Sequence, residues 1–139
     1  KADPVDGIDY DADLAYLSPE VLEGEAGIGI VYRRVGDTTA FLAGRERPVL
    51  ILLSDRFGVL NRSATLLLEQ LAYEYRGVID CLRAESSAHP DLMSFCQAGS
   101  VPCFALSEKG ILRRTTGGLT SIDEQQIRSM LDDLSGMDG

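Results

Sequence analysis

The feature that most constrains the fold of this chain is an uninterrupted apolar run, Pro48–Leu53, which is flanked by charged residues. A run of this length without polar alternation is typical of a β-strand buried on both faces, and such strands occur in sheets covered by helices on both sides. The next segment, residues 60–75, repeats apolar residues at helical spacing. A doubly buried strand followed by an amphipathic helix predicts an α/β fold.

Strand and helix patterns alternate from residue 27 onward, and a chain of 139 residues is long enough for one domain with a sizeable core. This alternation predicts a mixed central β-sheet with helices on both faces, in the order β-α-β-α-β-α-β-β-α. The expected strands are 28–32, 48–53, 78–82, 103–106 and 111–115, and the expected helices are 38–43, 60–75, 90–97 and one that begins at 121.

Proline and glycine residues recur at fixed intervals along this pattern. Counting from Ser54, Pro90 follows after 36 residues and Pro102 after a further 12, and then Gly110 and Gly118 follow at intervals of eight. In this order and spacing the chain resembles a bacterial thioredoxin. The resemblance implies a thioredoxin-like fold.

The resemblance covers about residues 27–135, and its departures lie where the chemistry of the family resides. The Trp-Cys-Gly-Pro-Cys turn of thioredoxins is replaced here by 57–61, which reads Phe-Gly-Val-Leu-Asn. Gly58 and Asn61 therefore stand at the degenerate redox positions, and Leu52 replaces the buried aspartate of the family. Dithiol exchange needs a thiolate, and neither position of the turn supplies one. We expect no catalytic residues at this turn.

The resemblance also implies a cis peptide bond between Val101 and Pro102 and a shallow groove beside it. In thioredoxins the backbone at this position pairs with an extended peptide. The candidate binding groove is formed by Phe57, Gly58, Val59, Val101 and Pro102. The expected function is therefore that of a redox-inactive module that binds a protein or peptide, and a homodimer is compatible with the same groove.

Three cysteines, Cys81, Cys96 and Cys103, leave a thiol-based alternative open. Cys96 and Cys103 flank the proline, so an atypical thiol-disulfide oxidoreductase or peroxidase using these two thiols is the rival hypothesis. Small buried cysteines in the core explain the same residues. Three cysteines and one histidine do not form a metal-ligand pattern, and we expect no metal and no cofactor.

Two alternatives concern ions. Asp9, Asp11 and Asp13 followed by Glu20 match part of a calcium-binding loop, but Leu14 stands where such a loop requires glycine. A solvated acidic segment is the simpler interpretation. At the start of the long helix, Asn61 is expected either to cap the helix or to mark a site for a small anion.

The charge of the chain is concentrated at its start. The formal net charge is −9, and residues 1–26 hold eight acidic groups against one lysine. This composition predicts an acidic N-terminal extension at 1–26, partly disordered or loosely packed, before a domain at 27–135 and a short tail at 136–139. No basic cluster favours nucleic acid, and no apolar run is long enough to span a membrane. A cytoplasmic location is slightly favoured, and a processed extracytoplasmic chain is also compatible.

Overall fold

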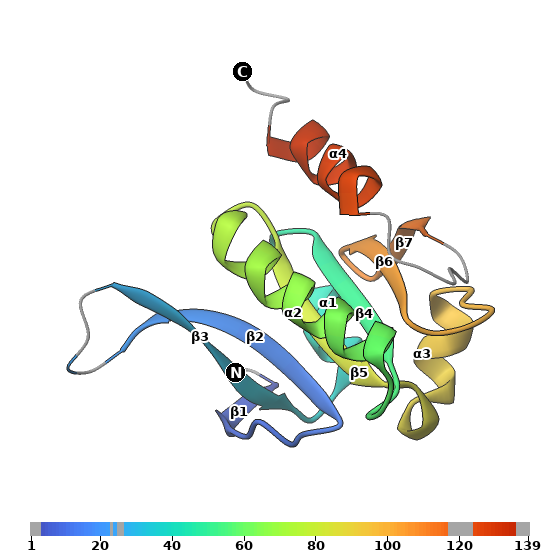
Figure 1. The fold of residues 1–139 in the computed structure, drawn as a ribbon, viewed down its shortest axis with the longest axis horizontal. Coiled ribbons are helices and arrows are strands. Elements are labelled where there is room, and N and C mark those ends of the chain that lie inside the picture. The colour runs from blue at the N-terminus through green and yellow to red at the C-terminus, as the bar shows by residue number, and fades with distance from the viewer. Residues whose placement is uncertain (1–3, 23, 25–26, 117–123, 136–139) are drawn as a thin grey trace.

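The apolar run lies in the middle of the sheet in the computed structural model, which describes residues 4–22, 24, 27–116 and 124–135 (Figure 1). Helices and strands follow the predicted order from residue 28 onward, with ends displaced by a few residues. The elements are β1 (Val5–Ile8), β2 (Leu14–Val21), β3 (Ile28–Val35), α1 (Thr38–Gly44), β4 (Val49–Ser54), α2 (Val59–Glu74), β5 (Asp80–Glu85), the 3-10 turn η1 (Ser86–Ala88), α3 (Pro90–Phe95), β6 (Cys103–Glu108), β7 (Ile111–Thr115) and α4 (Glu124–Ser135).

The described strands form one sheet of seven, in the order β1-β3-β2-β5-β4-β6-β7. β4 is parallel to β5 and antiparallel to β6, and every residue of β4 is buried. Its alternate side chains enter two cores: Leu50 and Leu52 pack with α2 and α4 on one face, and Ile51 and Leu53 pack with α1 and α3 on the other. The prediction of a mixed sheet covered on both faces is confirmed.

The prediction of a loosely packed N-terminal extension is wrong for most of residues 1–26. β2 lies inside the sheet, between β3 and β5, and Ala15 and Leu17 are completely buried. The described acidic residues that suggested an extension lie in β1, in the loop before β2 and toward the far end of β2, whereas the apolar residues of β2 enter the core. The domain therefore includes both β1 and β2, and the predicted boundary at residue 27 falls inside the β2–β3 hairpin.

The far end of the β2–β3 hairpin projects beyond the rest of the sheet (Figure 1). β2 pairs with β5 only at residues 14–16, whereas its pairing with β3 continues to Val21 and Ile28. We call residues 18–21 of β2 and 28–31 of β3 the outer ribbon. Of its two strands, only the β3 side has a counterpart in the predicted order of elements, the strand expected at 28–32.

The last helix closes the core on the α2 face. Ile127 and Leu131 of α4 are buried there, and Arg128 forms ion pairs with Glu74 of α2 and Glu124 of its own helix. The expected start of this helix at 121 and the tail at 136–139 lie outside the described residues. No helix among the described residues is long and apolar enough to cross a membrane.

Candidate functional site

The turn expected to carry the function lies at the carboxyl end of β4. Residues 55–58 connect this strand to α2, whose N-cap is Gly58. Gly58 has φ +107°, and a side chain there would be strained because L-residues rarely adopt this conformation. A Cβ atom at Gly58 would also lie 3.2 Å from the side-chain nitrogen of Asn61. Glycine, which stands here in place of a cysteine of thioredoxins, therefore suits the backbone conformation at position 58.

Asn61 does not cap α2, which corrects that part of the sequence interpretation. Its side-chain oxygen accepts a hydrogen bond from the backbone N–H of Asp55 at 2.8 Å, and its side-chain nitrogen donates to the carbonyl of Phe57 at 3.1 Å. Both bonds reach back from the first turn of the helix to the loop before it. Asn61 therefore holds the loop against the helix end.

The loop and the first turn of α2 present three apolar side chains to solvent. Phe57 is 81% exposed, Val59 is 79% exposed and Leu60 is 40% exposed. Burying side chains of this size is favourable by about 1.5–3 kcal/mol each, so their exposure in one short turn is unfavourable for the isolated protein. We call Phe57, Val59 and Leu60 the turn patch.

The bond between Val101 and Pro102 is cis, as the resemblance implied. Leu53 of β4 pairs with Cys103 of β6 at the end of their ladder, and Val101 lies two residues before that pair. Pro102 itself is buried, so the prediction that its ring lines an exposed groove is corrected. Val101 is half-buried, and its backbone N–H and C=O have no hydrogen-bond partner among the described residues.

The cysteines lie in the core, away from solvent. Cys81, Cys96 and Cys103 are reduced, and each is at least 99% buried. Burial raises the pKa of the Cys96 thiol to about 12, and the neighbouring Cys103 adds to this increase. Burial also raises the pKa of Cys81. Thiols in this state hold their protons at neutral pH and are poor nucleophiles.

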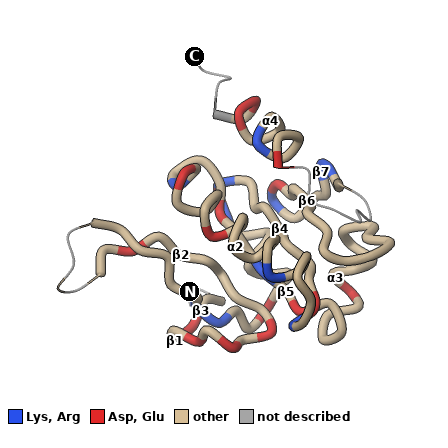
Figure 2. The backbone as a smooth tube through the Cα atoms, in the orientation of Figure 1, with Lys and Arg blue, Asp and Glu red and all other residues tan. Residues whose placement is uncertain are grey.

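Two acids of the suggested calcium loop, Asp9 and Asp13, and the nearby Asp6 are engaged with arginines. Arg34 pairs with Asp6 at 3.0 Å and with Asp9 at 3.3 Å, and Arg56 pairs with Asp13. The charge drawing shows acidic residues along β1 and the loop that follows it (Figure 2). No group of three or more metal-ligating side chains occurs within the described part of the chain.

Arg33 extends the same pattern to the outer ribbon. It forms a two-pronged ion pair with Glu20, and this contact lowers the pKa of the Glu20 carboxyl. Three of the four acids of the suggested calcium loop, Asp9, Asp13 and Glu20, are therefore held by arginines.

A small polar cavity of about 190 Å³ lies beside the first turn of α2, at the carboxyl ends of β4 and β5. Arg56, Arg62 and Arg83 line it together with Asp55 and Glu85. Arg83 donates a hydrogen bond to the carbonyl of Ala12 and lies over the ring of Tyr32. This arginine thus connects β5 to the N-terminal segment.

The fold of this chain is similar to the folds of several solved structures. The oxidised form of mitochondrial thioredoxin 3 from Saccharomyces cerevisiae matches with a TM-score of 0.57 and 16% identity, over 67% of this chain and 84% of that chain. A structure on the thiol resolving mechanism in yeast mitochondrial 1-Cys peroxiredoxin via glutathione/thioredoxin systems matches with a TM-score of 0.58 and 17% identity, over 67% and 84%. This chain has a thioredoxin-like fold. A designed protein is also similar, with a TM-score of 0.57 and 19% identity, over 67% and 80%.

The sequence matches no protein-family model and no curated protein. Within the thioredoxin-like fold, the structure places Phe57, Gly58 and Val59 at one turn and Val101 in the bend two residues before β6. It separates Cys96 and Cys103 from solvent. The sequence interpretation predicted the strand at 28–32 but missed its partner β2, whose signal was the apolar stretch at 14–17 before a Gly-Glu-rich segment.

Proposed function

We propose that this protein is a redox-inactive thioredoxin-like module that binds an extended segment of a protein or peptide at the turn patch and Val101. The observation that carries the proposal is the 81% exposure of Phe57 at the end of a loop held in place by Asn61. An exposed aromatic side chain on an anchored loop is a type of residue that is enriched at protein interfaces.

The unpaired backbone groups of Val101 favour the binding of an extended ligand over a helical one. Its N–H and C=O are unpaired within the described chain, and they lie next to the point where the pairing of β4 with β6 ends. An extended peptide would satisfy these groups and place alternate side chains over the turn patch. Backbone bonds would supply affinity, and contacts with Phe57 and Val59 would supply specificity.

The alternative, a thiol oxidoreductase or peroxidase at Cys96 and Cys103, finds less support. Both thiols are completely buried, and the raised pKa of Cys96 opposes formation of a thiolate near neutral pH. We expect no reduction of insulin with dithiothreitol or thioredoxin reductase as electron source. Turnover above that of a variant without cysteines would contradict this.

The binding proposal is tested by selecting ligands from a phage-displayed library of random nine-residue peptides. We expect peptides rich in apolar and β-branched residues to be enriched on the wild type and lost on Phe57→Ser. Tyr73→Ser is the matched control, because Tyr73 is also an exposed aromatic side chain, on α2 but away from the turn. A failure to enrich peptides, or equal enrichment on Phe57→Ser, would contradict the proposal.

A further inference from the structure

One edge of the outer ribbon has unpaired backbone groups. The carbonyl of Tyr32 accepts a hydrogen bond from the N–H of Asp9 at 2.8 Å, on the side of β3 that faces β1. Alternate residues of an antiparallel strand direct both backbone groups to the same side. Ile28 and Ile30 therefore direct their N–H and C=O groups to this side too, beyond the end of β1, and these groups have no partner among the described residues.

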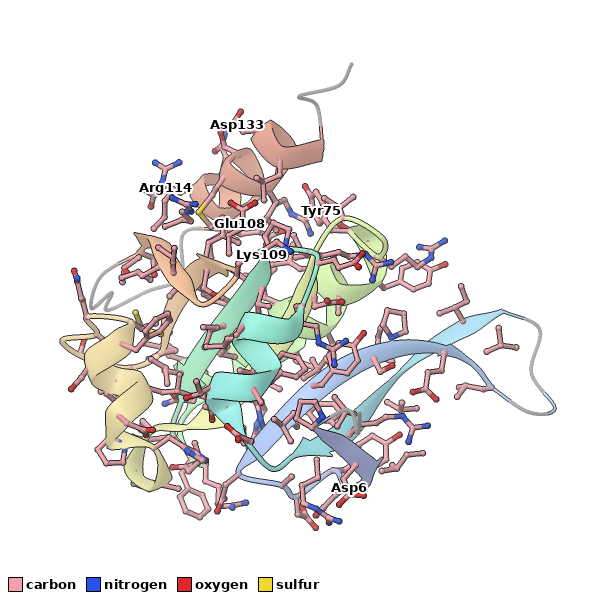
Figure 3. All side chains as sticks on the ribbon, turned by 180° about the vertical axis from the view of Figure 1, so that it is seen from behind. Asp6, Tyr75, Glu108, Lys109, Arg114 and Asp133 are labelled. Carbon is pink, nitrogen blue, oxygen red and sulfur yellow. The ribbon has the colours of Figure 1, made fainter. Side chains whose placement is uncertain are left out.

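The other described strand edges carry features that discourage pairing with another chain. β7 presents Arg113 and Arg114 and has a register irregularity, and β1 is short, irregular and carries Asp6. Asp6 and Arg114 lie at opposite ends of the molecule (Figure 3). Charges, bulges and short strands are the usual protection of sheet edges.

Within the outer ribbon, only the β3 edge lacks such protection. The β2 side contains Pro19 and Glu20, whereas residues 28–31 on the β3 side read Ile-Gly-Ile-Val, without a charge or a proline. An edge of this composition readily accepts a further strand. The contrast between the two sides of one hairpin singles out the β3 edge.

The side chains next to this edge form an apolar surface. Val21 pairs with Ile28 and Pro19 pairs with Ile30, so these four side chains lie on one face of the ribbon. Val21 is 77% exposed. A strand added along residues 28–31 would lie in line with β1, and its apolar side chains would extend this surface toward Tyr10.

The charge near the outer ribbon indicates which kind of added strand would bind there. Residues 1–35 hold eight acidic groups and three basic groups. The described acids among them lie in β1, in the loop that follows it and in β2, and four of these five pair with arginines (Figure 2). Among them, the exposed Asp11 forms no ion pair with any described residue. A second copy of the chain would bring the same acids to the contact, whereas a cationic segment would be attracted.

We propose that the β3 edge of the outer ribbon, residues 28–31, binds an extended cationic segment of a partner protein as an added β-strand. Backbone bonds to Ile28 and Ile30 hold the segment, and its apolar side chains pack beside Val21 and Pro19. Its lysine or arginine side chains face the acids near β1. This surface is separate from the turn patch and does not depend on the function proposed for it.

The test uses a fluorescein-labelled six-residue peptide in which lysine and valine alternate, and measures binding by fluorescence anisotropy. We expect saturable binding that weakens as salt is raised to about 0.5 M. Methylating the peptide nitrogens that face the edge should weaken binding about tenfold or more, because it removes the bonds to β3. Equal affinity for the methylated peptide, or for a peptide with glutamate in place of lysine, would overturn the proposal.

A substitution in the protein, rather than in the peptide, tests the same edge. Ile30→Pro removes an N–H that points away from β2, so the pairing of β2 with β3 is retained while binding should fall about tenfold. Ile30→Val is the matched control and should bind as the wild type does. Circular dichroism confirms the fold of both variants, and the methylated peptide gives an answer even if Ile30→Pro unfolds. A dimer of the wild type that Ile30→Pro converts to a monomer would overturn the cationic partner in favour of a second copy.

Discussion

Asn61 and Asp55 are joined by a 2.8 Å hydrogen bond from the backbone N–H of Asp55 to the side-chain oxygen of Asn61. A second bond from the Asn61 side chain reaches the carbonyl of Phe57. The position that holds the second cysteine in thioredoxins therefore fixes the shape of the loop in this chain. Fixing the loop also fixes the backbone position from which the exposed Phe57 side chain projects.

Replacing Asn61 by alanine removes both of these bonds. Asn61→Ala should lower the free energy of unfolding by about 1–2 kcal/mol, because a net contribution of about 0.5–1.5 kcal/mol per bond is reduced by the partial exposure of the site. Urea denaturation measures the loss. Asn61→Asp retains the acceptor for Asp55 and should lose less than the alanine variant. If Asn61→Ala left the free energy of unfolding unchanged, the loop would not depend on this side chain.

Gly58 makes a second, independent contribution to the turn through its φ of +107°. Gly58→Ala should lower the free energy of unfolding by about 1–2 kcal/mol, because a Cβ is disfavoured at this φ and would press on Asn61. The comparison is Gly99→Ala, where a Cβ meets nothing within 4 Å and φ is not in the left-handed region. Gly99→Ala should change stability by no more than about 0.5 kcal/mol. Equal effects of the two substitutions in urea denaturation would refute the argument.

The buried thiol of Cys96 should make the fold less stable at alkaline pH. Its pKa is raised from 9.0 to about 12, so above about pH 9 the unfolded chain releases a proton that the folded chain retains. Stability therefore falls as pH rises through this window, by up to about 1.4 kcal/mol per pH unit for this thiol. Urea denaturation between about pH 8 and pH 10.5 measures the slope.

Cys96→Ala should flatten that slope, although its stability at neutral pH will be lower because of the lost volume. A residual slope is expected from Cys81, Tyr16 and Tyr32, whose pKa values are also raised by burial. An unchanged slope in Cys96→Ala would show that this thiol ionises as easily in the folded chain as in the unfolded chain.

The part of the fold that the sequence predicted is the part whose signals are local. β4 is a continuous apolar run and α2 has a regular apolar stripe, so each is recognisable without its neighbours. β2 was missed because its place depends on distant pairing: Leu14 pairs with Ala84, and Tyr16 pairs with Leu82. The acidic residues around β2 suggested a solvated segment, and nothing local in the sequence indicated that two other strands cover its edges.

The turn between β4 and α2 was predicted in position, but its detailed geometry was not. The spacing of Ser54 and Pro102 located the turn and the neighbouring strand, because the register of β4 and β6 follows from the fold. The burial of Pro102 and the role of Asn61 were not predictable, since both depend on backbone angles that residue types do not specify. A glycine at position 58 was compatible with many conformations, and only the structure gives its positive φ.

Leu17 provides the most direct test of the corrected N-terminal boundary. It lies in β2, pairs with Tyr32 and is completely buried in the core beneath α2. Leu17→Ala should lower the free energy of unfolding by about 2–5 kcal/mol, because it removes buried methyl groups and leaves a cavity. Val21→Ala, on the exposed end of the same strand, is the matched control and should change stability by no more than about 0.5 kcal/mol. If both variants were as stable as the wild type in urea denaturation, β2 would be a loosely attached segment, and the domain would begin at β3 as the charge pattern first suggested.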